Sequence, residues 1–249
     1  MSLPETVSRD EWLAARKRLL VREKEFTRQR DALNADRRRM PMVRIDQDYE
    51  FEGPDGRASL LDLFQGRSQL IIYHLMFDPE WEKACPGCTA SMDETSAPML
   101  AHLNLRDTTF AAVSRAPYAK LAAYRAARKW VFPWYSSHGS DFNYDFHVTL
   151  DASVTPVEYN YRTLAELVQL DPGWADEGST EMPGFSCFLR DGDAVFHTYS
   201  TYARGTEQAD GTYGLLDLTA LGRQEDWEEP KGRAAQVNPP DPRLLLTDV

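Results

Sequence analysis

The chain has 249 residues and a formal net charge of -11, and 42% of its residues are hydrophobic. This length predicts one domain with elaborations or two small ones, and the hydrophobic content is ordinary for a globular protein. The acidic balance disfavours binding to nucleic acid or to an anionic membrane, because those partners need a basic excess that neutralises phosphates. Arg37, Arg38 and Arg39 are the one local exception, and we expect them to complement the dipole at a helix end.

The beginning of the chain (MSLPETVSRDEW) lacks the apolar core of a signal peptide, and no stretch reaches the length needed to span a bilayer. We therefore expect a soluble protein of the cytoplasm. In that reducing compartment the three cysteines do not form a structural disulfide framework. A close pair of cysteines there is more typical of a redox-active or metal-binding site.

A long helix is expected near the beginning of the chain. Ser8 suits the N-cap, Glu11 completes a capping box, and the segment that follows is free of Gly and Pro. Apolar residues recur at intervals of seven, at Trp12, Leu19, Phe26, Leu33 and Met40. Companion heptad positions such as Arg16 are charged, so a two-stranded coiled coil is poorly supported. We expect residues 1–42 to form an arm that packs along its own domain, with a homodimer through this arm as the alternative.

Residues 43–223 show an alternation of strands and helices. The near-continuous apolar run at residues 69–77 (QLIIYHLMF) is typical of a strand buried on both faces, and residues 110–114 (FAAVS) form a second such run. Helical segments follow both runs, which predicts a parallel sheet with right-handed crossovers. The clearest hairpin lies at residues 184–199, around an Arg-Asp-Gly-Asp turn. We therefore predict an α/β domain with a central sheet flanked by helices.

Two segments depart from this pattern. Residues 151–181 are acidic and polar with one plausible short helix, and we expect them to be an insertion into the domain. From about residue 224 the chain is charged and then rich in proline. Residues 224–249 are therefore expected to form a loosely packed polar tail.

The chemistry visible in the sequence lies at residues 81–94 (WEKACPGCTASMDE), directly after the first apolar run. Pro86 suits the first turn of a helix, where its missing N–H costs nothing, so Cys85 is expected at the helix cap and Cys88 one turn inside. The unpaired N–H groups of a helix start favour a thiolate, and Lys83 can add to this effect. We predict that Cys85 is the nucleophile and that the buried Cys88 resolves the mixed disulfide.

Two other interpretations compete with redox chemistry. A CxxC motif is also half of a zinc site, but the histidines are scattered and no second CxxC is present, so we expect neither a metal nor a dissociable cofactor. A non-catalytic interaction module would use the arm and an aromatic surface instead. The third cysteine, Cys187, is expected to be a small buried residue, with an approach to the dithiol as the alternative.

Several stretches carry a family resemblance. The run FEGPDGRASLLDLFQGRSQLIIYHLMF, the later AAVSRAPYAKLAAY and the hairpin FSCFLRDGDAVF together resemble the core of peroxiredoxins and other thioredoxin-fold proteins. EWLAARKRLL, YHLMFDPEWEKACPGC, SSHGSDFNYDF and FHTYSTYARG look like an uncharacterised bacterial family of thioredoxin-like proteins, catalogued as a domain of unknown function. The resemblance implies a thioredoxin-like (peroxiredoxin-like) fold and a dithiol–disulfide oxidoreductase activity. Its substrate would be a disulfide-containing protein or a small oxidant, and a reducing thiol partner would restore the dithiol.

The resemblance also makes a thiol peroxidase the alternative function. Peroxiredoxins carry a PxxxTxxC motif, in which the Thr and a distant Arg hold the peroxide. Asp78 and Glu82 stand at the matching positions here, so the motif is lost, although Arg115 can supply a positive charge.

A thioredoxin-like fold further implies a cis-proline that faces the CxxC motif just before the hairpin strand, and Pro183 is the candidate. The residues expected to face the substrate or to support the two cysteines are Trp81, Lys83, Pro86, Arg115, Pro183 and Cys187.

Overall fold

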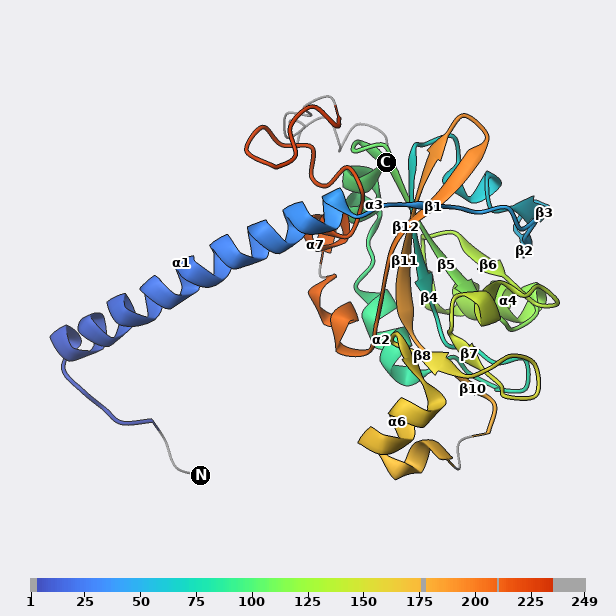
Figure 1. The fold of residues 1–249 in the computed structure, drawn as a ribbon, viewed down its shortest axis with the longest axis horizontal. Coiled ribbons are helices and arrows are strands. Elements are labelled where there is room, and N and C mark those ends of the chain that lie inside the picture. The colour runs from blue at the N-terminus through green and yellow to red at the C-terminus, as the bar shows by residue number, and fades with distance from the viewer. Residues whose placement is uncertain (1–3, 176–177, 210, 235–249) are drawn as a thin grey trace.

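The computed structural model describes residues 4–175, 178–209 and 211–234 (Figure 1). Its centre is an eight-stranded sheet of order β1-β12-β11-β4-β5-β6-β2-β3. The strands are β1 (Val43–Arg44), β2 (Glu50–Gly53), β3 (Gly56–Ser59), β4 (Gln69–His74), β5 (Thr108–Ser114), β6 (Trp134–Ser136), β11 (Gly184–Asp191) and β12 (Ala194–Tyr202). β4, β5 and β6 are parallel to one another, β11 is antiparallel to β4, and β12 forms the hairpin with β11.

The order β12-β11-β4-β5, with a helix after each parallel strand and a closing antiparallel hairpin, is the thioredoxin-like arrangement. The predicted α/β class, with a central sheet flanked by helices and a long N-terminal helix, is therefore confirmed (Figure 1). β4 and β5 are buried along their whole length, which explains why their sequences are apolar without alternation.

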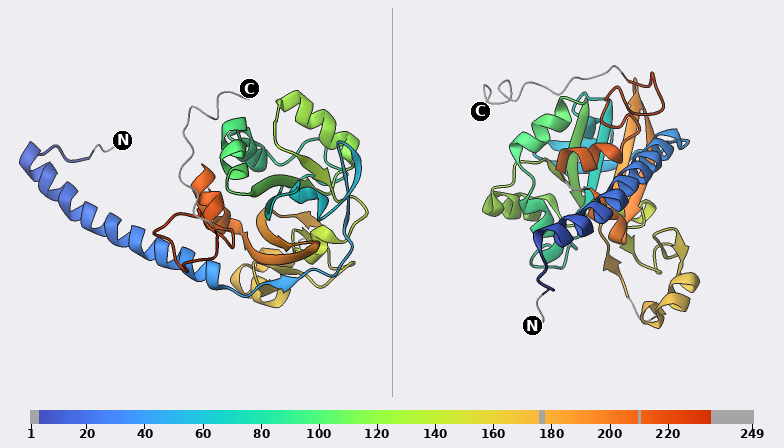
Figure 2. Two further views of the ribbon diagram at one scale, coloured as in Figure 1. Left: turned by 90° about the horizontal axis from the view of Figure 1, so that it is seen from above. Right: turned by 90° about the vertical axis from the view of Figure 1, so that its left-hand side faces the viewer.

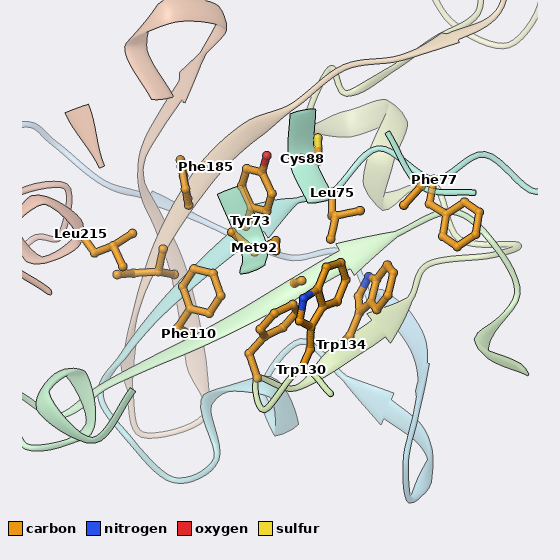
Figure 3. Close-up of a cluster of buried hydrophobic side chains, with 14 of the residues drawn as sticks. Tyr73, Leu75, Phe77, Cys88, Met92, Phe110, Trp130, Trp134, Phe185 and Leu215 are labelled. Atoms are coloured by element: carbon orange, nitrogen blue, oxygen red, sulfur yellow. The ribbon is translucent and has the colours of Figure 1, made fainter. Parts of the chain in front are cut away.

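Two hydrophobic cores lie on opposite faces of the sheet. Successive residues of β4 divide between them, since Ile71 and Tyr73 join one core and Leu70 and Ile72 join the other. The helices that cover the Tyr73 face are α2 (Pro86–Asp93), α3 (Ala97–Asn104), α4 (Tyr118–Arg128) and α7 (Gly211–Asp217). The elements that cover the other face include η1 (Asp62–Phe64), α5 (Phe142–Asp145) and part of the insertion. The core under the four helices, shown in Figure 3, contains Cys88.

The arm is a single helix, α1 (Arg9–Arg39), which begins at the predicted capping box. The hydroxyl of Ser8 accepts from the N–H of Glu11, whose carboxylate accepts from the N–H of Ser8 in return. The residues of α1 that are buried are Asn34, Ala35 and Arg38. Figures 1 and 2 show the rest of the helix projecting from the sheet, so the expectation that the arm packs along its own domain holds only for the last turns. Neither α1 nor any other described helix is long and apolar enough to cross a membrane.

The segment that we expected to be an insertion, residues 151–181, forms short elements at one edge of the domain. They are β8 (Glu158–Tyr159), β9 (Arg162–Thr163), α6 (Leu164–Leu170), η2 (Pro172–Ala175) and β10 (Thr180–Glu181). β10 pairs with β7 (Thr149–Leu150), so the two ends of the insertion lie side by side.

The prediction of a loosely packed tail is wrong for residues 224–234. Glu228 is only 6% exposed and forms an ion pair of 2.9 Å with Arg38 of α1. Gln224 is also buried and donates to the carbonyl of Arg106 at 2.7 Å. These contacts fix the segment between α1 and the sheet, whereas residues 235–249 of the predicted tail lie outside the described residues.

Candidate active site

The two cysteines of the CPGC motif lie at the beginning of α2, where the sequence predicts them. Cys85 is the N-cap residue, Pro86 takes the first helical position, and Cys88 follows inside the first turn. The N–H of Cys85 donates a hydrogen bond of 3.0 Å to the carbonyl of Met76, just beyond β4. This bond fixes the helix start against the end of the strand that precedes it.

The two thiols differ in exposure. Cys85 is partly exposed, whereas Cys88 is 4% exposed and belongs to the core of Figure 3. Burial raises the pKa of the Cys88 thiol to about 11, while hydrogen bonds with Tyr73 and with the backbone of Met76 oppose that rise. Cys85 packs against the core that contains Cys88, and its proximity raises the pKa of the Cys88 thiol further. An accessible thiol therefore lies in direct contact with a buried one.

Tyr73 is a site residue that the sequence analysis missed. It lies in β4 with 5% of its surface exposed, and its ring centroid is 4.8 Å from that of Phe185. Burial and the neighbouring cysteines raise the pKa of its hydroxyl, so the group stays protonated and can donate to Cys88. Figure 3 shows the hydroxyl of Tyr73 at the same end of the cluster as the sulfur of Cys88. The signal in the sequence was a tyrosine that directly follows Leu and Ile in a buried strand.

Arg115 lies just after β5, at the edge of the sheet where β4 leads to the CPGC motif. Its guanidinium forms ion pairs with two carboxylates. Its Nε donates to Glu181 at 2.7 Å, and another nitrogen forms an ion pair with Asp78. Glu181 is 1% exposed, and burial raises the pKa of its carboxyl although Arg115 offsets part of the rise. The hydroxyl of Thr149 lies 2.9 and 3.0 Å from the two oxygens of Glu181. Arg115 therefore ties the insertion to the sheet and does not present a free charge to a peroxide.

The loop between β4 and α2 carries two of the predicted supporting residues. Trp81 is partly buried and packs against the core that contains Cys88. Lys83 is exposed two positions before Cys85. A second lysine holds this loop, because Nζ of Lys120 in α4 donates to the carbonyl of Pro79 at 2.8 Å.

Pro183 directly precedes β11, but its peptide bond is trans. The cis bond among the described residues is the one before Pro230. The prediction of a cis-proline at position 183 is therefore wrong. The chain reaches β11 from the pairing of β10 with β7, and the N–H of Met182 donates to the carbonyl of Val148 at 2.8 Å, which continues that pairing up to Pro183.

Cys187 lies in β11, the neighbour of β4, but the register keeps it away from the dithiol. Cys187 pairs with Ile71 of β4. Met76, whose carbonyl accepts the hydrogen bond from the N–H of Cys85, lies five residues farther along the chain. At the usual rise of a strand this offset corresponds to about 16 Å. Cys187 is fully buried, and burial raises the pKa of its thiol to about 12. It is the small buried residue that we expected, and the alternative of a third sulfur beside the pair is wrong.

Within the described part of the chain, no three His, Cys, Asp or Glu side chains gather as ligands for a metal ion. His74 instead lies 2.8 Å from the hydroxyl of Ser186. Ser186 continues through Ser200 to His197 in a chain of hydrogen bonds across β4, β11 and β12. These two histidines are hydrogen-bonding residues inside the sheet.

A family profile described as "Bacterial protein of unknown function (DUF899)" matches residues 1–238. The chain belongs to this family. The match to DUF899 includes the arm as well as the thioredoxin-like domain. No curated protein matches the chain.

Solved structures to which this DUF899 chain is similar include two bacterial peroxiredoxin-type proteins. Peroxiredoxin Q of Xanthomonas campestris is 13% identical with a TM-score of 0.43, and the match covers 66% of this chain and 87% of that chain. Peroxidoxin BcpB from Mycobacterium tuberculosis is 15% identical with a TM-score of 0.45, and the match covers 72% of this chain and 94% of that chain. The assignment of the fold rests on the sheet topology described above.

Proposed function

We propose that this protein is a thiol–disulfide oxidoreductase that uses Cys85 and Cys88. The observation that carries the proposal is the contact between a partly exposed thiol at the N-cap of α2 and a buried thiol inside the first turn. Such a pair can close into a disulfide with little movement of the backbone, and only its outer sulfur can meet a substrate. We place the exchange in the cytoplasm, where reducing thiols can restore the pair.

The reaction begins when the thiolate of Cys85 attacks one sulfur of a substrate disulfide. The substrate S–S bond breaks, one substrate thiolate leaves, and a mixed disulfide joins Cys85 to the other sulfur. Cys88 then loses its proton and attacks the sulfur of Cys85, which releases the second substrate thiolate. The chain is left with a Cys85–Cys88 disulfide, and the substrate has gained two electrons and two protons.

Tyr73 would support the second step. Burial makes the thiolate of Cys88 costly to form, and the hydroxyl of Tyr73 is the side-chain donor in contact with it. A donor at that place stabilises the charge as it develops, because hydrogen bonds to charged groups are stronger than neutral ones. Tyr73 is thus a positioning and stabilising residue for the resolving step.

The alternative, a thiol peroxidase, has less support at this site. A peroxide-reducing thiol needs a nearby positive charge that is free to hold the peroxide. Asp78 and Glu181 already pair with Arg115, so the three charged groups together carry a net negative charge when ionised. Attack of a thiolate on a disulfide sulfur needs no such charge.

Trapping of the mixed disulfide tests the proposal. The reduced protein is mixed with glutathione disulfide, and products are followed by mass spectrometry. We expect Cys88→Ser to accumulate a glutathione adduct on Cys85. Wild type should release the glutathione and form the internal Cys85–Cys88 disulfide, and Cys85→Ser should do neither. Cys187→Ala serves as the matched control and should behave as wild type. Equal reactivity of Cys85→Ser and wild type would refute the assignment, and oxidation by hydrogen peroxide far faster than by the disulfide would favour the peroxidase.

A further inference from the structure

Most of α1 has no surface of its own chain to pack on. The helix has 31 residues, and its contacts to the body lie at its C-terminal end. There Arg38 pairs with Glu228 at 2.9 Å, and the guanidinium of Arg37 lies 5.3 Å from the ring centroid of Tyr199. Residues 9–33 extend over about 38 Å, at 1.5 Å per residue. Phe26 and Leu33 border an open groove that they share with Tyr213 of the body, and the helix before Phe26 projects away from the body (Figures 1 and 2). Helices in water gain most of their stability from burying an apolar face, so this segment lacks its main source of stability.

The projecting segment carries an exposed line of large apolar side chains, which we name the arm stripe. Its members and their exposed fractions are Trp12 (48%), Leu19 (47%), Phe26 (66%) and Leu33 (48%). Residues seven apart drift by only about 20° per heptad, so these four lie within an arc of roughly 60°. A row of exposed large apolar side chains on a helix without a packing surface favours an interaction site.

The charge of the arm favours a partner with an acidic surface. α1 contains eleven Lys or Arg and six Asp or Glu, which gives a formal charge of +5. The whole chain carries 28 Lys or Arg and 39 Asp or Glu, so the remainder of the chain has 17 basic and 33 acidic residues and a formal charge of -16. The arm and the body therefore attract each other, yet the outer part of the arm, before Phe26, projects away from its own body, and Phe26 and Leu33 face an open groove beside it. A second copy of the chain supplies an acidic body to receive it.

The same charges disfavour a dimer in which two arms pair with each other. Such a pair would bring two helices of charge +5 together, and charged residues such as Arg16, Glu23 and Arg30 interrupt the apolar line.

Docking of the arm on the body of a second copy also gives a sufficient buried area. A helix face about 38 Å long and 10 Å wide covers roughly 380 Å². Two exchanged arms, counted on both surfaces, would bury roughly 1,500 Å², which is the size of a standard interface.

We propose that the chain forms a homodimer by reciprocal arm exchange, in which the arm stripe of each copy docks on the acidic body of the other. The interface combines apolar contacts from the stripe with attraction between a basic helix and an acidic surface. Because part of that attraction is screened by salt, the dimer should weaken as ionic strength rises.

The test compares Phe26→Glu with Val21→Glu in the full chain. Val21 is a matched control, because it is 67% exposed on the same helix but lies off the arm stripe. Light scattering after size exclusion should give a mass near twice the 28.4 kDa of one chain for wild type and for Val21→Glu. Phe26→Glu should lower the dimer affinity by at least tenfold, with an unchanged near-ultraviolet circular dichroism spectrum showing that the domain is still folded.

Several results would overturn the proposal. A wild-type monomer at all concentrations would do so, and so would equal dissociation of Phe26→Glu and Val21→Glu. A dimer that tightens as salt rises would show arm-on-arm pairing, in which screening relieves repulsion. A monomer that binds vesicles containing phosphatidylserine, and loses that binding in Phe26→Glu, would assign the arm stripe to a membrane surface instead.

Discussion

Tyr73→Phe is the substitution that isolates the hydroxyl beside the buried thiol. The phenylalanine ring can keep the packing of Tyr73 against Phe185, where the ring centroids are 4.8 Å apart. The substitution therefore removes only the hydrogen bond that opposes the raised pKa of Cys88, which stands at about 11. We expect the attack of Cys85 to continue at its normal rate and the resolving step to slow.

The size of the effect follows from the strength of that hydrogen bond. A hydrogen bond to a charged group contributes about 1.5–3 kcal/mol. Because one pKa unit corresponds to about 1.4 kcal/mol, its loss should raise the pKa of Cys88 by roughly one to two further units. The thiolate population falls accordingly, but a more basic thiolate is a better nucleophile, with a Brønsted coefficient of about 0.4–0.5. The resolving step should therefore slow by roughly 3- to 10-fold.

The assay is rapid quenching of the glutathione reaction, in which the mixed disulfide is a separate mass. Tyr124→Phe is the matched control, because the hydroxyl of Tyr124 bonds to Thr89 at 3.1 Å in the same core and not to either thiol. Tyr73→Phe should show a longer-lived mixed disulfide, and Tyr124→Phe should not. If both variants resolve the mixed disulfide at the wild-type rate, the role assigned to Tyr73 is refuted.

Three further predictions concern the same site and its surroundings. In wild type, the resolving step should accelerate with rising pH up to about 11, because the thiolate fraction of Cys88 grows until its pKa is reached, and a rate that is flat between pH 7 and pH 9 would contradict this. Arg115→Gln leaves the carboxylates of Asp78 and Glu181 without their partner, so urea unfolding should show a loss of about 3 kcal/mol, whereas an unchanged midpoint would mean that the pairs contribute nothing. Cys187→Ser buries a hydroxyl in the core and should lower the free energy of unfolding by about 1–3 kcal/mol. The thiol reaction should keep its rate, and a slower reaction would show that Cys187 takes part in the site.

Local features of the sequence were sufficient to predict much of the fold. The capping box at Ser8 located the beginning of α1, and Pro86 located the beginning of α2 with Cys85 as its cap. Each of these features acts between residues that are close in the chain, so its geometry follows from the sequence alone. The buried strand β4 was visible for the same reason, as an apolar run without alternation.

Features that depend on distant parts of the chain were not predictable in this way. The register between β11 and β4 moves Cys187 away from the dithiol, and no local pattern encodes that register. The sequence shows that Arg115 is charged. It does not show that Asp78 and Glu181, which are distant from it in the chain, pair with that charge. Tyr73 was missed because its role depends on the helix that brings Cys88 against it.

The most direct test of the account is a redox titration of the wild-type protein against glutathione, followed by peptide mapping of the oxidised form. The account predicts one two-electron transition and one internal disulfide, which links Cys85 to Cys88. An oxidised protein without that bond, or with a bond that includes Cys187, would contradict it.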